Sequence, residues 1–369
     1  MSNPAQELIK FGQSVWYDNI SRELLEKGEL KRLVNEWGVR GVTSNPTIFD
    51  KAISSGSSYD KQIAELKTKK LTPDLVFEEL ALIDIAAAAD VLLPVFQESK
   101  GEDGYVSIEV SPLLAANTQG TVEEGLRLFK RLNRPNIMVK VPGTKEGIPA
   151  VKALLEAGVN VNITLLFSAE NYVEVAKTYV AALRERVKKN QPVDQIRSVA
   201  SFFVSRVDTS VDSKLAEIEK SKPEQAALAK ALRGKFGIAN CKIAYKRYQE
   251  IFEGAEFADL KAKGAHVQRP LWASTGTKDP AYSDVMYVDT LIGPNTVNTM
   301  PHATLEAFVS HGKCGQTITQ DVAGAEQTAQ QLTDLGIDLS KVLLDLQIDG
   351  VKKFAESFQS LNAAIQKKL

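Results

Sequence analysis

The sequence has few of the residues from which disulfide and metal sites are built. Its 369 residues include only two cysteines and three histidines. Cys241 and Cys314 cannot form a disulfide framework, and neither stands in a zinc-ligand spacing. The histidines match no H-E-x-x-H pattern. These absences exclude a disulfide-stapled module, and we expect a protein of a reducing compartment that uses no metal.

Cofactor signatures, an excess of charge and membrane-length apolar runs are also missing. Without a G-x-G-x-x-G turn or a G-x-S-x-G elbow, we expect no nicotinamide or flavin cofactor and no hydrolase serine. The 45 basic and 46 acidic residues give a net charge of −1, which provides no general field for nucleic acid or an anionic membrane. The most apolar stretch, 75–96, contains four acidic residues, and residues 1–12 lack a signal-peptide pattern. We therefore expect a cytoplasmic protein with small-molecule partners.

What is present is the composition of an ordinary globular protein and an alternation of short strands with helices. Hydrophobic residues make up 44% and charged residues 25% of the chain, enough for a large core. Eight β-branched or aromatic runs separated by helical patterns predict a single (β/α)₈ barrel over residues 1–369. The predicted strands cover residues 13–18, 40–45, 105–110, 136–141, 159–164, 197–203, 269–275 and 285–289. The eighth fits least well, because nine residues after Thr275 are fewer than the roughly 10 to 12 that a crossover needs.

Several helices are expected in addition to those of the barrel. Thr72-Pro73-Asp74 predicts a helix start, and Thr121 with Glu124 predicts a capping box. Residues 208–264 read as an enlarged connection with two long amphipathic patterns, and residues 315–369 read as C-terminal helices. These helices could cover the barrel or a partner, so a monomer and a homodimer both remain open.

Polar residues gather near the carboxyl ends of the predicted strands, where barrel enzymes build their active sites. Because side chains alternate along a strand, Lys140 shares a face with Met138, and Asn162 shares a face with Thr164. The same counting places Trp272 and Ser274 on one face. Asp18, Glu109 and Ser201 also lie at or near such strand ends.

Lys140 is the most informative of these residues. Burial disfavours a charged ammonium, so a lysine inside an apolar strand supplies an amine for Schiff-base chemistry. A structural ion pair with Glu109, or an outward-facing side chain, explains the same pattern without chemistry. Asp18 and Glu109 fit general acid and base roles, with capping or ion pairing as the alternative.

Two further groups fit a sugar phosphate. Asn45 and Asn162 suit hydrogen bonds to sugar hydroxyls, or else cap a turn. Arg206, just beyond a strand end, could clamp a phosphate, and Lys278 lies in a glycine-containing loop with similar potential. Both basic residues could equally be solvated.

Taken together, the motifs resemble the transaldolases along nearly the whole chain, and the longer segments 268–278 and 287–295 resemble the larger bacterial subfamily. The motifs are Val42-Thr-Ser-Asn-Pro-Thr-Ile-Phe49, Ser107-Ile-Glu-Val110, Ile137-Met-Val-Lys-Val-Pro142, Val161-Asn-Ile-Thr-Leu-Leu-Phe-Ser168, Ser201-Phe-Phe-Val-Ser-Arg206 and Trp272-Ala-Ser-Thr275.

The resemblance implies transfer of dihydroxyacetone from sedoheptulose 7-phosphate to glyceraldehyde 3-phosphate in the non-oxidative pentose phosphate pathway. The products are erythrose 4-phosphate and fructose 6-phosphate. In this family Lys140 corresponds to the Schiff-base lysine, and Glu109 with Thr164 moves protons through a water. Asp18 handles the proton of the C4 hydroxyl.

The resemblance also assigns the binding residues. Asn45, Asn162 and Ser201 surround the dihydroxyacetone fragment. Phe203 stands where fructose-6-phosphate aldolase relatives tend to carry tyrosine, which favours transfer over release. Arg206 and Ser274 match the phosphate clamp. Smaller bacterial transaldolases have a second arginine where this chain has Gly276, and Lys278 is the substitute candidate.

The residues alone are compatible with three other functions. A class I aldolase shares the lysine but releases free dihydroxyacetone. A metal-dependent lyase would bind Mg²⁺ through Asp18, Glu109 and Asp289, with Lys140 as a base. A non-catalytic sugar-phosphate-binding barrel would keep the site without turnover.

Overall fold

Eight parallel strands close into a barrel in the order of the sequence. The structure, a computed structural model, describes residues 2–369, and each strand pairs with its neighbours in the chain, while β1 also pairs with β8. The side chain of Gln13 helps to join these two strands, because its Nε2 donates to Thr296 Oγ1 at 2.9 Å. The predicted (β/α)₈ architecture is confirmed. The strands are β1 (Gln13–Tyr17), β2 (Val39–Val42), β3 (Tyr105–Glu109), β4 (Ile137–Pro142), β5 (Val161–Leu166), β6 (Ser198–Phe203), β7 (Gln268–Ala273) and β8 (Thr296–Met300).

The eighth predicted strand is wrong. Residues 285–289 contain the short helix α14 (Met286–Asp289), and β8 follows at Thr296–Met300. Tyr287 and Val288 are buried as part of one helical turn, which explains why their run looked like a buried strand. The later position of β8 also removes the difficulty with the crossover length after β7.

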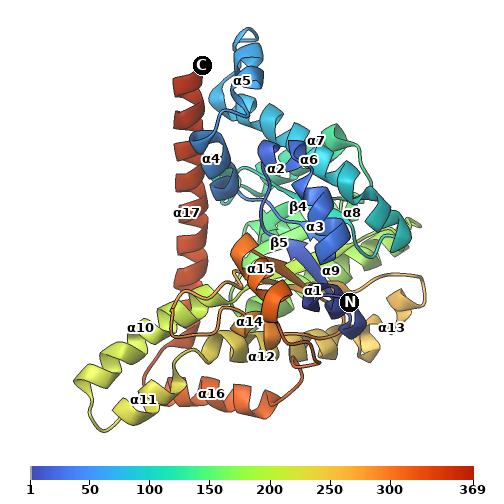
Figure 1. Cartoon of the computed structure of the whole chain (residues 1–369). Coiled ribbons are helices and arrows are strands. Elements are labelled where there is room, and N and C mark those ends of the chain that lie inside the picture. The colour runs from blue at the N-terminus through green and yellow to red at the C-terminus, as the bar shows by residue number, and fades with distance from the viewer. Residues whose placement is uncertain (1) are drawn as a thin grey trace.

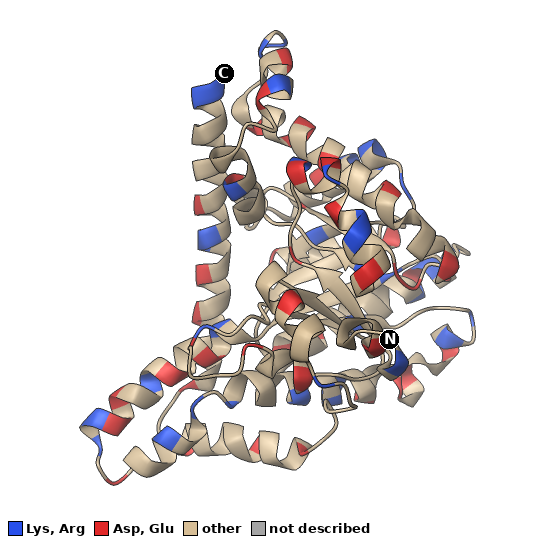
Figure 2. Ribbon diagram, viewed as in Figure 1, with Lys and Arg blue, Asp and Glu red and all other residues tan. Residues whose placement is uncertain are grey.

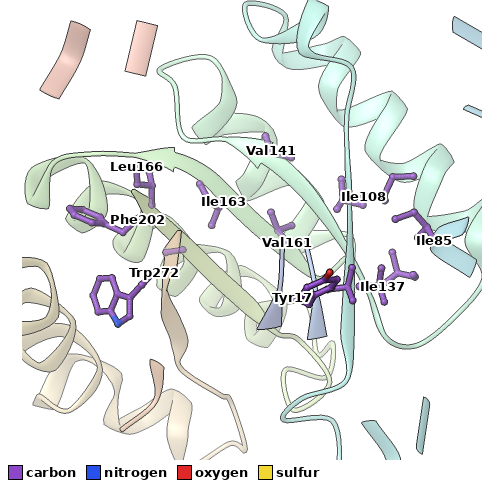
Figure 3. Close-up of a cluster of buried hydrophobic side chains, with 14 of the residues drawn as sticks. Tyr17, Ile85, Ile108, Ile137, Val141, Val161, Ile163, Leu166, Phe202 and Trp272 are labelled. Carbon is purple, nitrogen blue, oxygen red and sulfur yellow. The ribbon is translucent and has the colours of Figure 1, made fainter. Parts of the chain in front are cut away.

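The two faces of the strands bury different layers. One face packs against the surrounding helices, as Figure 3 shows for Ile108, Val141 and Ile163. The other face fills the barrel interior with a separate cluster that includes Trp16 and Met138. The alternation predicted from the sequence therefore holds for most strands.

The predicted face of Trp272 is wrong. Its ring packs against Phe202 in the helix-facing layer, with the ring centroids 6.2 Å apart (Figure 3). Ser274 nevertheless faces the barrel mouth together with Ala273. Ser274 has φ 55°, so the strand alternation ends before this residue and both neighbours point to the same cavity.

Helices surround the barrel and extend beyond it (Figure 1). Helix α6 begins at Pro73 as predicted. The predicted capping box is wrong, because Asn117 caps α7, Thr121 lies inside that helix, and Glu124 accepts from the Ser111 backbone N–H at 2.6 Å. The helices are α1 (Pro4–Glu7), η1 (Leu8–Phe11), α2 (Arg22–Glu26), α3 (Glu29–Trp37), α4 (Pro46–Ser55), α5 (Asp60–Lys67), α6 (Pro73–Glu98), η2 (Pro112–Leu114), α7 (Thr118–Leu132), α8 (Gly147–Glu156), α9 (Ala169–Lys188), α10 (Ser205–Ser221), α11 (Ala226–Leu232), α12 (Phe236–Phe252), α13 (Ala255–Lys261), α14 (Met286–Asp289), α15 (His302–His311), α16 (Val322–Asp334) and α17 (Leu339–Lys368).

The enlarged connection and the C-terminal helices are both present. Helices α10 to α13 fill the connection between β6 and β7, and α16 packs against α12. Helix α17 runs along one side of the molecule and contacts α4 and α6 (Figure 1). Helix α17 therefore packs against the barrel of its own chain, and α16 packs on the outer helix α12.

The surface mixes charges of both signs. Figure 2 shows lysine and arginine interspersed with aspartate and glutamate over the outer helices. Within residues 2–369, no helix combines the length and the apolar character needed to cross a membrane.

A buried carboxyl ties the enlarged connection to α14. Asp208 accepts hydrogen bonds from the Gly237 backbone N–H at 2.6 Å and from the Tyr287 hydroxyl at 2.8 Å. Burial raises the pKa of Asp208 from 3.8 to about 6, despite these hydrogen bonds. The folded protein therefore resists ionisation of this group more than the unfolded chain does.

We predict that this carboxyl makes stability fall as the pH rises. Its contribution is complete below the unfolded pKa near 4 and is lost as the pH passes about 6. The free energy of unfolding, measured relative to that of an Asp208→Asn variant, should drop by up to about 3 kcal/mol over this range. Urea unfolding at a series of pH values checks this, with Asp212→Asn as the control for loss of a neighbouring carboxylate. A difference that is independent of pH would contradict it.

Candidate functional site

A small cavity opens at the carboxyl ends of the strands, around the side chain of Lys140. Its volume is about 50 Å³, and residues from seven strand ends meet there. The lining residues are Asp18, Thr43, Asn45, Lys140, Thr164, Ser201, Phe203, Arg206, Ala273, Ser274, Thr299 and Phe354. Eight of the eleven residues predicted from the sequence are in this set.

Lys140 is buried in the barrel, with its side chain 5% exposed. Its Nζ donates to the Ser44 carbonyl oxygen at 3.1 Å and lies 3.3 Å from Glu109 Oε2. The pairing of β3 with β4 places Glu109 directly beside Lys140. Lys140 therefore has the ion-pair partner that a structural role would need. Its amine also faces the cavity, as Schiff-base chemistry would need.

Asp18 faces the same cavity from the end of β1. Its Oδ1 accepts from the Thr43 hydroxyl at 2.7 Å, and Thr43 in turn is 2.7 Å from the Thr299 hydroxyl. Burial raises the pKa of Asp18, while Lys140, this hydrogen bond and Arg206 oppose the rise. A raised pKa favours a role for this carboxyl in proton transfer.

Glu109 and Thr164 flank Lys140 on the neighbouring strands. Burial raises the pKa of Glu109, and the positive charge of Lys140 opposes that rise. Glu109 Oε2 and Thr164 Oγ1 are both buried without a hydrogen-bond partner. Apart from the ion pair of Glu109 Oε2 with Lys140, these two oxygens have room to bond a water or a substrate hydroxyl.

Asn162 lies directly beside Lys140 in the β4–β5 register. Its Nδ2 donates to Ser107 Oγ at 3.0 Å, and its Oδ1 accepts from Ser201 Oγ at 2.7 Å. Asn162 is fully buried and is not among the residues that line the cavity. It supports the cavity from beneath, with Ser201 above it.

Asn45 combines the two roles that the sequence left open. Its Oδ1 accepts from the Ile48 backbone N–H at 3.0 Å and so caps α4. It also lines the cavity of Lys140 and a second cavity of about 540 Å³ that extends past Glu109 beneath α17. The cap leaves the amide nitrogen of Asn45 available for a ligand.

Arg206, Phe203 and Ser274 form the opposite wall of the small cavity. The Arg206 guanidinium lies 5.1 Å from the centre of the Phe203 ring. Arg206 Nη1 and the neighbouring Ser205 Oγ are buried without a hydrogen-bond partner at the start of α10. Burial lowers the pKa of Arg206. Unpartnered donors at a helix N-terminus suit an anion.

Lys278 is separate from this set. It is exposed in the loop after β7 and does not line the cavity. Asp289, the third ligand of the metal-dependent alternative, bonds the Lys313 backbone N–H through its side chain and also lies outside the cavity. Within the described chain, no three His, Cys, Asp or Glu side chains are grouped so that they could bind a metal ion.

Four lining residues were not predicted as site residues. Thr43 lies on the same face of its predicted strand as Asn45, so the alternation of side chains could have identified it. Thr299 belongs to β8, which was predicted at the wrong place in the sequence. Ala273 was missed because the two faces of β7 are the reverse of those predicted. Phe354 comes from α17, and its ring lies 5.6 Å from Lys140 Nζ. No local pattern in the sequence indicates this contact.

Comparisons with known proteins agree with each other over nearly the whole chain. The family model described as Transaldolase/Fructose-6-phosphate aldolase matches residues 15–365. The protein named Transaldolase from Trichodesmium erythraeum is 43% identical, covering 100% of this chain and 98% of that protein. Transaldolase 2 from Nostoc sp. strain PCC 7120 is 44% identical with the same coverage of 100% and 98%. The protein named Transaldolase from Mycolicibacterium smegmatis is 45% identical, covering 97% of this chain and 95% of that protein.

Proposed function

This chain belongs to the transaldolase/fructose-6-phosphate aldolase family, and from that premise we propose that it is a cytoplasmic transaldolase of the non-oxidative pentose phosphate pathway. It transfers dihydroxyacetone from sedoheptulose 7-phosphate to glyceraldehyde 3-phosphate and yields erythrose 4-phosphate and fructose 6-phosphate. The observation that carries the proposal is the buried amine of Lys140, 3.3 Å from Glu109 in a cavity that also contains Asp18.

The reaction starts at Lys140. Its amine attacks the C2 carbonyl of the ketose to form a carbinolamine, and loss of water gives the Schiff base. Glu109 and Thr164 move the required protons through a water. The unpartnered Thr164 Oγ1 supports this role, and so does Glu109 Oε2, whose contact with Lys140 Nζ at 3.3 Å leaves room for a bond to that water.

Asp18 acts at the bond that breaks. It takes the proton of the C4 hydroxyl as the C3–C4 bond is cleaved, and the aldehyde product leaves. The electron pair remains on the fragment bound to Lys140 as an enamine, which attacks the second aldehyde while Asp18 returns a proton. The raised pKa of Asp18 supports both directions of transfer.

The fragment must stay bound between the two half-reactions. Asn45 bonds its hydroxyls, and Ser201 lines its pocket. We retain Asn162 as a second contact, although it lies beneath the cavity and its side chain would have to reach the fragment past Ser201. Phe203 offers no hydroxyl to the fragment, which favours transfer over release. The alternative, a fructose-6-phosphate aldolase-like enzyme, would release dihydroxyacetone in an assay without an acceptor aldehyde.

The phosphate of each substrate binds at the start of α10. Arg206 contributes a guanidinium with an unpartnered Nη1, and Ser274 faces the same cavity. We retain Lys278 as the candidate for a second basic contact, although its loop would have to bring it closer to the cavity.

The proposed mechanism predicts a covalent adduct on Lys140. Borohydride reduction in the presence of fructose 6-phosphate should leave a dihydroxyacetone-sized or sugar-sized mass on this residue, as found by intact-mass and peptide mass spectrometry. The adduct should vanish in Lys140→Met and persist in Lys145→Met, which removes an exposed lysine just beyond β4. No adduct, together with loss of activity in chelator, would replace the proposal with the metal-dependent lyase.

The hydrogen bond from Thr43 to Asp18 predicts a shift in the pH profile. In Thr43→Val the carboxylate loses a donor, so the pKa of Asp18 should rise further and the acidic limb of kcat/KM should move to higher pH. A hydrogen bond to a charged group contributes about 1.5–3 kcal/mol, so activity on the acidic limb should fall about tenfold or more. Thr299→Val keeps the Thr43 donor and should shift the limb less. Equal shifts in both variants would contradict this account.

The phosphate site predicts a selective loss of affinity. Arg206→Ala should raise KM for phosphorylated substrates by about tenfold or more, because it removes charge-assisted hydrogen bonds. Turnover of fructose, a donor without phosphate, should change much less. Lys278→Ala should raise the same KM if this side chain reaches the phosphate. An unchanged KM in that variant would remove Lys278 from the clamp.

A further inference from the structure

Helix α17 presents one face to the mouth of the barrel. Gln347, Gly350, Phe354 and Phe358 are spaced by three or four residues and lie on that face. The helix contacts β5, α4 and α10, and in Figure 1 it passes alongside the barrel from α10 to α4. Of these four residues only Phe354 lines the cavity described above, and the proposed mechanism gives none of them a role.

Gln347 anchors the helix beside the reactive lysine. Its Nε2 donates to the Gly143 and Leu165 carbonyl oxygens at 3.1 and 3.0 Å, and it lies 3.0 Å from Asn171 Oδ1. Gly143 follows β4 and Leu165 lies in β5, so this one amide links α17 to the two strands that carry Lys140 and Thr164.

The contact at β5 is unusually close. Leu165 has φ 59°, a left-handed conformation that is costly for a bulky residue and calls for surrounding support. A Cβ on Gly350 would lie 2.8 Å from Leu165 Cδ2, so only glycine lets the helix approach here without a shift. The strained segment immediately follows Thr164.

This anchoring places Phe354 over Lys140. The ring lies 5.6 Å from Nζ and lines the same cavity as Asp18, Ser201 and Arg206. Phe354 is 5% exposed. With the ring in place the cavity is about 50 Å³, small against the roughly 300–1,000 Å³ of typical ligand pockets. The ring therefore closes the small cavity of Lys140 on the side of α17.

We propose that Phe354 is a specificity-determining residue that retains the three-carbon fragment on Lys140, with Gln347 as its positioning residue. This proposal rests on the Schiff-base function proposed above. Release of the fragment requires protonation of the enamine carbon, addition of water to C2 and cleavage of the C–N bond, which gives dihydroxyacetone and the free amine. Both routes end with hydrolysis of a Schiff base, so protonation of the enamine carbon is the step that separates release from transfer. An apolar ring over Nζ keeps bulk water from delivering that proton, so transfer to the acceptor aldehyde prevails.

The test measures how the fragment partitions. For each variant, free dihydroxyacetone released from fructose 6-phosphate without acceptor is divided by the rate of transfer to erythrose 4-phosphate. Phe354→Ala should raise this ratio about tenfold or more, and Gln347→Leu should raise it by a smaller factor. Phe354→Leu keeps an apolar side chain and should also give a smaller rise, which preserves the test if the alanine variant does not fold.

Phe358→Ala is the matched control. Phe358 is one turn further along the same face and is equally buried at 5%, but its ring packs against Phe77 at 5.8 Å and does not line the cavity of Lys140. The ratio of release to transfer in Phe358→Ala should equal that of the wild type. An unchanged ratio in Phe354→Ala and Phe354→Leu, or an equal rise in Phe358→Ala, would overturn the proposal.

Borohydride trapping on the same variants separates this proposal from the proposed function. Phe354→Ala should still form the adduct on Lys140, because the ring takes no part in forming the Schiff base. Absence of the adduct in the wild type would refute the lysine mechanism. An adduct in every variant with an unchanged partition ratio would refute only the role of Phe354.

Discussion

Burial of one amine among carboxyls is the constraint on which the barrel mouth depends. An ammonium removed from water costs several kcal/mol unless it is paired and hydrogen-bonded. Lys140 has the Ser44 carbonyl oxygen and Glu109 for this purpose. The same burial raises the pKa of both Asp18 and Glu109. One enclosed space therefore contains an amine and two carboxyls, and the charge of the amine opposes the rise in the pKa of each carboxyl.

A buried polar layer gives this arrangement its rigidity. Ser107, Asn162 and Ser201 form a chain of hydrogen bonds across β3, β5 and β6 beneath the cavity. Thr299, Thr43 and Asp18 form a second chain across β8, β2 and the end of β1. Because each buried polar group needs its partner, these side chains have little freedom to change rotamer. The reacting groups are thus fixed before a substrate arrives.

Much of the site could be predicted because most strands are regular. Two-residue alternation correctly placed Lys140 and Thr164 in the barrel interior, and seven of the eight strands were located. Strand β8 escaped because three of its five buried residues, Thr296, Asn298 and Thr299, are polar, so the run does not resemble a buried strand. Phe354 could not be predicted, because its contact with Lys140 depends on where a distant helix docks. The predicted face of Trp272 was wrong because two-residue counting grouped it with Ser274, and Ser274 has left the strand conformation.

The dispersal of the site along the chain constrains its assembly during synthesis. Asp18 comes from the first strand, and Phe354 comes from the last helix. One edge of β1 also has no hydrogen-bonding partner until β8 has been synthesised, because β8 supplies both the backbone pairing and the bond from Gln13 to Thr296. Contacts of such long sequence separation form late in folding. A nascent chain still lacking α17 therefore exposes a reactive amine at an uncovered barrel mouth, so the ribosome must release nearly the whole polypeptide before the chemistry can be enclosed.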